Sequence, residues 1–342
     1  MWSKSARRGK GTESGVMLAL AGASLLLGCR GGKAAGAPVK PRGPVLERTL
    51  DATDIMPGDL DLVARLDVGR MRSSLGPVAA EGLAARAKAR VGDDDALGEA
   101  IACAEVLWVG ARLGDLDGGD HVVVVEGPGC TPALPPARWE KVPTANGRVA
   151  VFDRRGESAE RAGTARVITL GKRLTAYVSP MEVDSTSRVL QEGPDSKRGN
   201  PSAEGVVSVD FRGGRLPPTL ERKYPSIGAV LGGIERVRGT AQVGDDGIEV
   251  EAEVRSPTEK GASRVMHFLE AVRDNVSEAR LLEVMGRVKL EQVESSVRVR
   301  VVLPAGLVLG LLSGKRGESE SGAGGESGSE GGAGSQEKPK GP

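Results

Sequence analysis

The chain has 342 residues, with 47 Lys and Arg against 46 Asp and Glu. A net charge of +1 excludes a protein that binds nucleic acid through bulk positive charge, and three Cys exclude a disulfide-dense small domain. With three Phe, three Trp and two Tyr, the chain also has little material for aromatic platforms that stack sugars or bases. Gly, at 50 residues, is about twice as frequent as the usual ~7 %. We expect part of the chain to remain unfolded.

The first 28 residues have the parts of an export signal. Four basic residues (Lys4, Arg7, Arg8 and Lys10) precede an apolar run over residues 16–27. The run is shorter than the ~20 residues that a membrane-spanning helix needs, so we interpret residues 1–28 as a signal peptide. An ordinary cleavable signal and the twin-arginine export route remain alternatives.

The end of this run, Leu26-Leu27-Gly28-Cys29, resembles the lipobox of bacterial lipoprotein precursors. The resemblance implies cleavage after Gly28, diacylation of the Cys29 thiol and a third acyl chain on the new N-terminus. Two or more acyl chains anchor a protein stably without a spanning helix. In this family an Asp after the Cys retains the product at the inner membrane. Arg30 at that position therefore favours an outer membrane lipoprotein, on its periplasmic or surface face.

Two segments of low complexity flank the core of the chain. Residues 29–48 contain the lipidated Cys and a tether rich in Gly, Ala, Pro and basic residues. Residues 314–342 are rich in Gly, Ser and Glu and contain no apolar residue larger than Ala. Such a segment cannot bury enough apolar surface to offset its ordering entropy, so we predict a disordered tail.

The core between them predicts an α+β fold made of two tandem similar lobes, residues 49–195 and 196–313. Residues 63–68 and 206–211 share an extended pattern with an Asp between apolar residues. Each is followed by a hairpin, over residues 106–126 and 237–254, and then by a second hairpin. We interpret the three landmarks as an internal repeat, in which each lobe is an antiparallel sheet with helices on one face. Chance similarity of generic α+β sequence is the alternative.

The hairpin over residues 237–254 can be registered from its pattern. With the turn at residues 244–247, Val243 lies opposite Ile248 and Val237 lies opposite Val254. This register places the apolar side chains on one face and the Glu residues of 249–253 on the other, as in a half-buried sheet. A helix should follow, with Ser256 as N-cap, Pro257 in its first turn and Glu259 completing a capping box.

Cys103 and Cys130 lie almost symmetrically about the turn of the first hairpin. Antiparallel pairing brings them to the same end of two strands, where a disulfide is geometrically feasible. Export to an oxidising compartment favours that bond. A catalytic or metal-binding thiol is the alternative, but neither Cys has ligands at a suitable spacing.

The sequence indicates no catalytic residue, metal ligand or cofactor-binding residue. His121 and His267 lack a second ligand at zinc-site spacing, and the acidic residues 115–120 and 93–95 are interpreted as solvated turn or helix-start residues. Trp108 and Trp139 are expected to anchor the core of the first lobe.

These patterns together favour a non-catalytic envelope lipoprotein. Its expected partners are the membrane, through the acyl chains, and an envelope protein. No small-molecule substrate and no cofactor are identified. A carrier of lipid or another apolar ligand and an envelope hydrolase with an unrecognised site are the two alternatives.

Overall fold

A computed structural model describes residues 51–82, 85, 95–112, 120–144, 148–156, 163–193, 201–213, 228, 230, 232–276 and 279–308. The predicted signal peptide, Cys29, the tether and the Gly/Ser/Glu-rich tail lie outside these residues. The predictions made for them therefore stay predictions.

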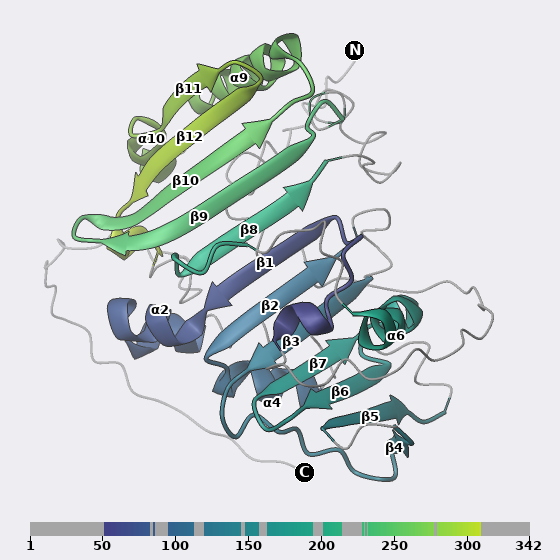
Figure 1. Cartoon of the computed structure of the whole chain (residues 1–342). Coiled ribbons are helices and arrows are strands. Elements are labelled where there is room, and N and C mark those ends of the chain that lie inside the picture. Colours follow the sequence, from purple (N-terminus) through teal and green to yellow (C-terminus); the bar gives the residue numbers. More distant parts are fainter. Residues whose placement is uncertain are drawn as a thin grey trace, which may run out of the picture.

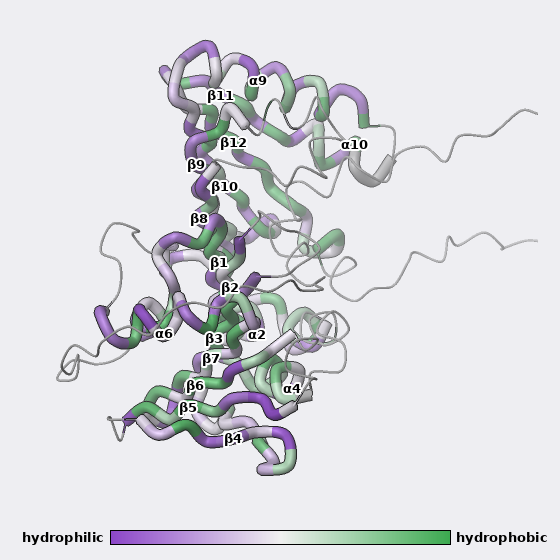
Figure 2. Tube along the Cα trace, turned by 90° about the vertical axis from the view of Figure 1, so that its right-hand side faces the viewer, coloured by the Kyte–Doolittle hydropathy of each residue, from purple (hydrophilic) through white to green (hydrophobic). Residues whose placement is uncertain are grey.

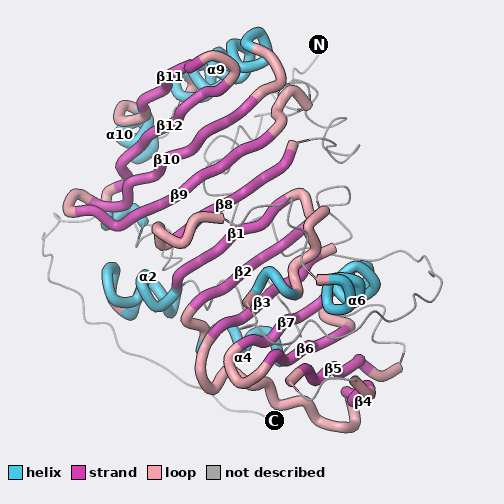
Figure 3. Tube along the Cα trace, viewed as in Figure 1, coloured by secondary structure: helices cyan, strands magenta, loops and turns pink. Residues whose placement is uncertain are grey.

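Twelve strands form one antiparallel sheet (Figures 1 and 3), in the order β11-β12-β10-β9-β8-β1-β2-β3-β7-β6-β5-β4. The first seven strands along the chain are β1 (Leu62–Asp67), β2 (Val106–Ala111), β3 (His121–Glu126), β4 (Trp139–Val142), β5 (Val149–Arg154), β6 (Arg166–Leu170) and β7 (Leu174–Val178). The other five are β8 (Val207–Arg212), β9 (Arg236–Gly244), β10 (Gly247–Arg255), β11 (Lys289–Val293) and β12 (Ser296–Leu303). The predicted α+β class with antiparallel pairing is confirmed.

The middle of the sheet is the pair β1 and β8, in which Ala64 lies opposite Val209. Outward from this pair, one side continues through β2, β3, β7 and β6, and the other through β9, β10, β12 and β11. β5 and β4 extend the first side. The sheet is continuous across the middle pair, and its division into two similar lobes stays a prediction.

The predicted hairpins are present. In β9 and β10, Val243 lies opposite Ile248 and Val237 opposite Val254, so the register read from the alternating pattern is confirmed. β2 pairs with β3, β6 with β7, and β11 with β12. In each hairpin the two strands are close in sequence, which is why local patterning was sufficient to pair them.

One face of the sheet, here called the helix face, is covered along its length by four helices. They are α2 (Val68–Leu75), α4 (Asp95–Cys103), α9 (Glu259–Asp274) and α10 (Ala279–Met285). Ala100 and Ile101 of α4 pack on Ala64 and Leu66, and Ala262 and Val265 of α9 pack on Val254. Leu75 of α2 packs beside Val284 of α10. The apolar positions of the alternating strands are buried or half-buried beneath this layer.

The opposite face is also covered over the strands β1 to β7, where Val63 of β1 belongs to the same buried cluster as Ile55 and Leu60. The 3-10 helices η1 (Ala52–Asp54) and η2 (Pro180–Glu182) and the helix α6 (Val183–Glu192) lie there, on the other side of the sheet from α4, α9 and α10 (Figure 2). The prediction that helices pack on one face is therefore wrong for the first half. All five residues of β7 are buried, and a strand that is apolar on both faces needs cover on both.

α9 begins two residues later than its sequence suggested. Its N-cap is Thr258, whose side chain accepts a hydrogen bond from the Gly261 N–H at 3.1 Å. Ser256 is instead held to the turn between β11 and β12, because its N–H donates to the Ser295 carbonyl at 2.9 Å. The tertiary hydrogen bond overrides the capping pattern that Ser256 and Glu259 offered locally.

Candidate binding surface

The sheet surface opposite the helix face is not covered by any described helix over the strands β8 to β12 (Figures 1 and 2). We call this surface the open face. Its outward positions are almost all polar or charged: Asp210, Arg236, Arg238, Thr240, Gln242, Glu249, Glu251, Glu253, Arg255, Lys289, Glu291, Arg298 and Arg300. The strict alternation of β10 causes this, since each second residue faces the helices and the others face away.

The charges of the open face are ordered across the strands. One cross-strand row consists of residues whose signs alternate from β8 to β11: Asp210, Arg238, Glu253, Arg298 and Glu291. The next row contains Glu251 opposite Arg300, with Lys289 beyond it. Residues directly opposite each other in a sheet have Cβ atoms about 5 Å apart. Opposite charges are therefore neighbours throughout the first row and at the Glu251–Arg300 pair of the second, whereas Lys289 lies opposite a charge of its own sign.

Only some of these charges are paired within the chain. Arg300 Nε lies 2.9 Å from Glu251 Oε1, with both side chains about 60 % exposed. In the part of the chain that the structure describes, Glu253, Glu291 and Arg298 make no ion pair within 4 Å. These side chains are exposed, so their charges are available to a partner.

An ion pair between a buried carboxylate and a half-buried Arg lies at the inner edge of the open face. Asp210 is 2 % exposed and accepts from Arg236 Nε at 2.6 Å and from its Nη2 at 2.8 Å. The hydrogen bond with Asp210 raises the pKa of Arg236 above its usual value. A bidentate pair of this kind holds both groups in one geometry. Asp210 also holds one end of the alternating row in place.

The segment of residues 57–61 borders the open face. Arg212 donates to the Gly58 carbonyl at 3.0 Å, and its N–H donates to the Asp61 carbonyl at 2.7 Å. Arg112 also holds this segment, since its Nη2 lies 2.7 Å from Asp59 Oδ1. Burial of Asp59 raises its pKa, but the hydrogen bond and charge of Arg112 outweigh burial and lower it below its usual value. The side chains of Arg212 and Arg112 therefore attach residues 57–61 to the sheet.

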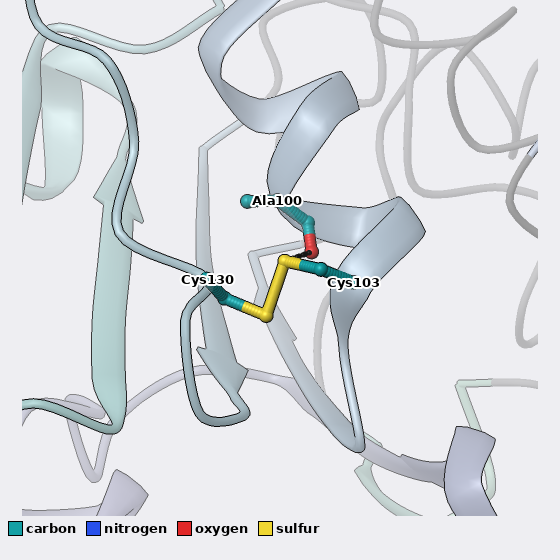
Figure 4. Close-up of a disulfide and its surroundings, with 3 residues drawn as sticks. All are labelled: Ala100, Cys103 and Cys130. Carbon is teal, nitrogen blue, oxygen red and sulfur yellow. Dashed lines mark hydrogen bonds between the residues drawn. A yellow bond between two sulfur atoms is a disulfide. The ribbon is translucent and has the colours of Figure 1, made fainter.

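Cys103 and Cys130, predicted from their symmetry about the hairpin, form a disulfide with a Cα–Cα distance of 5.7 Å (Figure 4). Cys103 is the last residue of α4, and Cys130 lies in the loop after β3. The β2–β3 ladder continues past its ends, because the Glu105 N–H donates to the Glu126 carbonyl at 2.8 Å. The bond attaches α4 to this end of the hairpin, which is a structural role.

The other residues considered from the sequence do not come together. His121 is buried at the start of β3, and its N–H donates to Ser179 Oγ at 2.9 Å. His267 is exposed on α9, where its Nδ1 lies 3.2 Å from Glu270 Oε2. Trp139 is buried in the core, as predicted. Among the described residues there is no group of His, Cys, Asp and Glu placed to hold a metal ion, and no helix long and apolar enough to cross a membrane.

Several sequence predictions fall outside the described residues. They include Cys29, the acidic residues 115–119 and Asp93 and Asp94. Trp108, the other predicted core anchor, is half-buried and packs against the core cluster that contains Val63 and Val122. Arg65 was not singled out from the sequence. Trp108 lies under the guanidinium of Arg65, which is 5.7 Å from the ring centroid and donates to Asp67 at 3.1 Å. A pairing of β1 with β2 was needed to see that these residues are neighbours.

No family model matches the chain, and no curated protein matches it either. Solved structures do match. Crystal form I of TP0453 has a TM-score of 0.45 and 8 % identity, and covers 79 % of this chain and 99 % of its own. Crystal form III of the same protein has a TM-score of 0.46 and 8 % identity, and covers 78 % and 99 %.

Proposed function

We propose that this chain is a lipid-anchored lipoprotein of the cell envelope, in the outer membrane, and that it acts as a non-catalytic binding or structural module. The lipobox resemblance around Cys29 supports the anchor. The observation that supports the binding role is the open face, where no described helix covers the exposed charges of the strands β9 to β12. Binding is the function assigned to that face.

We also propose that the fold contains an internal repeat of two lobes. The strand order outward from the middle pair supports it, because β1, β2, β3, β7 and β6 correspond in order to β8, β9, β10, β12 and β11. The two outermost strands on this side, β5 and β4, and the second layer of helices are then additions to the first lobe. In this scheme, η1 and α6 cover this side of the sheet in the first lobe, and the same side of the second lobe is the open face.

The anchor is tested by replacing Cys29 with Ala in the full chain. If acyl chains supply the attachment, the variant leaves the membrane fraction, while the wild type stays there after a high-salt wash. Retention of the variant in the washed membranes would show a second anchor or refute lipidation. A Cys29→Ser variant should behave as the Ala variant does, because neither residue has a thiol to acylate.

The binding role is tested by placing a photoreactive residue at single positions in living cells. Glu251, Glu253 and Arg298 report on the open face, and Arg264 and Glu283, which are exposed on helices α9 and α10, are the controls. Cross-links to one defined partner, this chain included, should form from the first set and not from the second. An equal cross-linking pattern from both sets contradicts the assignment of the open face. Recovery of a bound lipid with the purified chain would favour the carrier instead.

A further inference from the structure

The open face is complementary to a second copy of itself. We infer that the partner of the open face is another copy of this chain, bound face to face about a twofold axis that runs parallel to the strands between β10 and β12. This inference rests on the proposed binding role of that face. It identifies the partner and the contacts.

The rows of the open face determine the position of the axis. Glu253 and Arg298 lie directly opposite each other, one on β10 and one on β12, as do Glu251 and Arg300. A twofold axis between these strands and parallel to them places β10 of one copy over β12 of the other without a shift along the strands. Each Glu then faces the Arg of the same cross-strand pair on the other copy.

The same axis also pairs the neighbouring strands favourably. It places β9 over the partner copy's β11, because these strands are the next ones on either side of the β10–β12 pair. Arg238 of one copy then faces Glu291 of the other, since both belong to the row of Glu253 and Arg298. Thr240 faces Lys289 in the next row. Over these two rows no like charges face each other.

Other axis positions and other partners fit the charges less well. An axis through β10 itself would place the Glu residues of that strand over the same Glu residues of the second copy. A polyanion would meet Glu249, Glu251 and Glu253, and a polycation would meet Arg238, Arg298 and Arg300. Like charges placed opposite each other disfavour an interface. A partner therefore needs charges of both signs at positions that match these rows, which the second copy has.

The chemistry of the contact determines its strength. Packed sheets lie about 10 Å apart, a gap that Arg and Glu side chains can bridge from both sides. Exposed ion pairs contribute little individually and are screened by salt, so the association should be weak and salt-sensitive. Attachment of both copies to one membrane by the proposed acyl chains would raise their effective concentration.

The test co-expresses two differently tagged copies of the full chain and recovers one through its tag from mild detergent. In an acidic-face variant, Arg238, Arg298 and Arg300 are replaced by Glu. In a basic-face variant, Glu251, Glu253 and Glu291 are replaced by Lys. Wild-type copies should be recovered together at low salt, and about 0.5 M NaCl should reduce that recovery. Each variant alone should lose co-recovery about tenfold, and the mixed pair should regain it.

The mixed pair is also the control for folding, because variants that had simply unfolded would not recover each other. Absence of wild-type co-recovery at low salt, or failure of the mixed pair, overturns the second copy as partner. The two proposals fail differently. If the open-face positions still form a defined cross-link to another envelope protein, the binding role stands and only the partner is wrong. If they form none, the binding role itself fails.

Discussion

Arg112 and Glu182, 70 residues apart in sequence, form a charged pair in which Arg112 Nε donates to Glu182 Oε1 at 2.5 Å. Glu182 is 1 % exposed and also accepts from the Ser185 hydroxyl, whereas Arg112 is partly exposed. Arg112 extends from the end of β2, and Glu182 ends η2 where α6 begins. The pair therefore joins the layer formed by η2 and α6 to the sheet.

Replacing Glu182 with Ala should lower the free energy of unfolding by about 2–3 kcal/mol. A fully buried pair loses more when one partner is removed, but the partial exposure of Arg112 moderates the cost. Urea unfolding measures the change. The matched control is Glu140→Ala, which removes an exposed pair with Arg155 at 3.7 Å and should cost less than ~0.5 kcal/mol. Equal losses in the two variants would show that the Arg112–Glu182 pair is not a structural tie.

The pKa of Asp59 predicts a weakening of the same region in acid. Its folded-state pKa lies below its usual value near 3.8, mainly because Arg112 outweighs the effect of burial. The carboxylate thus contributes stability above that value, and the contribution is lost as the pH falls through the folded-state pKa. Urea midpoints of the wild type and Asp59→Asn should differ at about pH 6 and converge towards about pH 2. A constant difference over this range would exclude Asp59 as a source of acid sensitivity.

The disulfide should contribute to stability by constraining the unfolded chain. Cys103 and Cys130 are 27 residues apart, and closing a loop of this length is worth about 3 kcal/mol in the chain-entropy treatment. The double variant Cys103→Ala, Cys130→Ala should lose this amount in urea unfolding. Thiol labelling of the unfolded, unreduced wild type should find neither residue reactive, and labelling of both would refute the bond.

The two faces of β10 should respond differently to substitution. Val254 is 8 % exposed and packs under α9, so Val254→Asp should cost about 2–4 kcal/mol by burying a carboxylate without a partner. Glu253, the preceding residue, is exposed on the open face, and Glu253→Gln should change stability by less than ~0.5 kcal/mol. The urea midpoint measures both. Similar losses of stability in the two variants would contradict the finding that β10 is buried on the helix face and exposed on the open face.

Local patterns in the sequence were enough to predict the hairpins. The alternation of residues 237–254 determined their register, since a slip of one residue would turn every apolar side chain to solvent. The symmetry of Cys103 and Cys130 about a turn likewise predicted their bond, because a hairpin determines which residues meet at its ends. Export and lipidation at Cys29 remain predictions of the sequence.

The order of strands that are distant in sequence was decided by the tertiary structure. The period of a strand shows which residues share a face, but it does not show which strand lies beside it. The pairing of β1 with β8 joins residues more than a hundred positions apart into one sheet. The alternating row from Asp210 to Glu291 exists only because five strands are ordered and registered. Local patterning indicated that β10 has a charged face, and the sheet arranged those charges into rows because strand pairing is a long-range interaction.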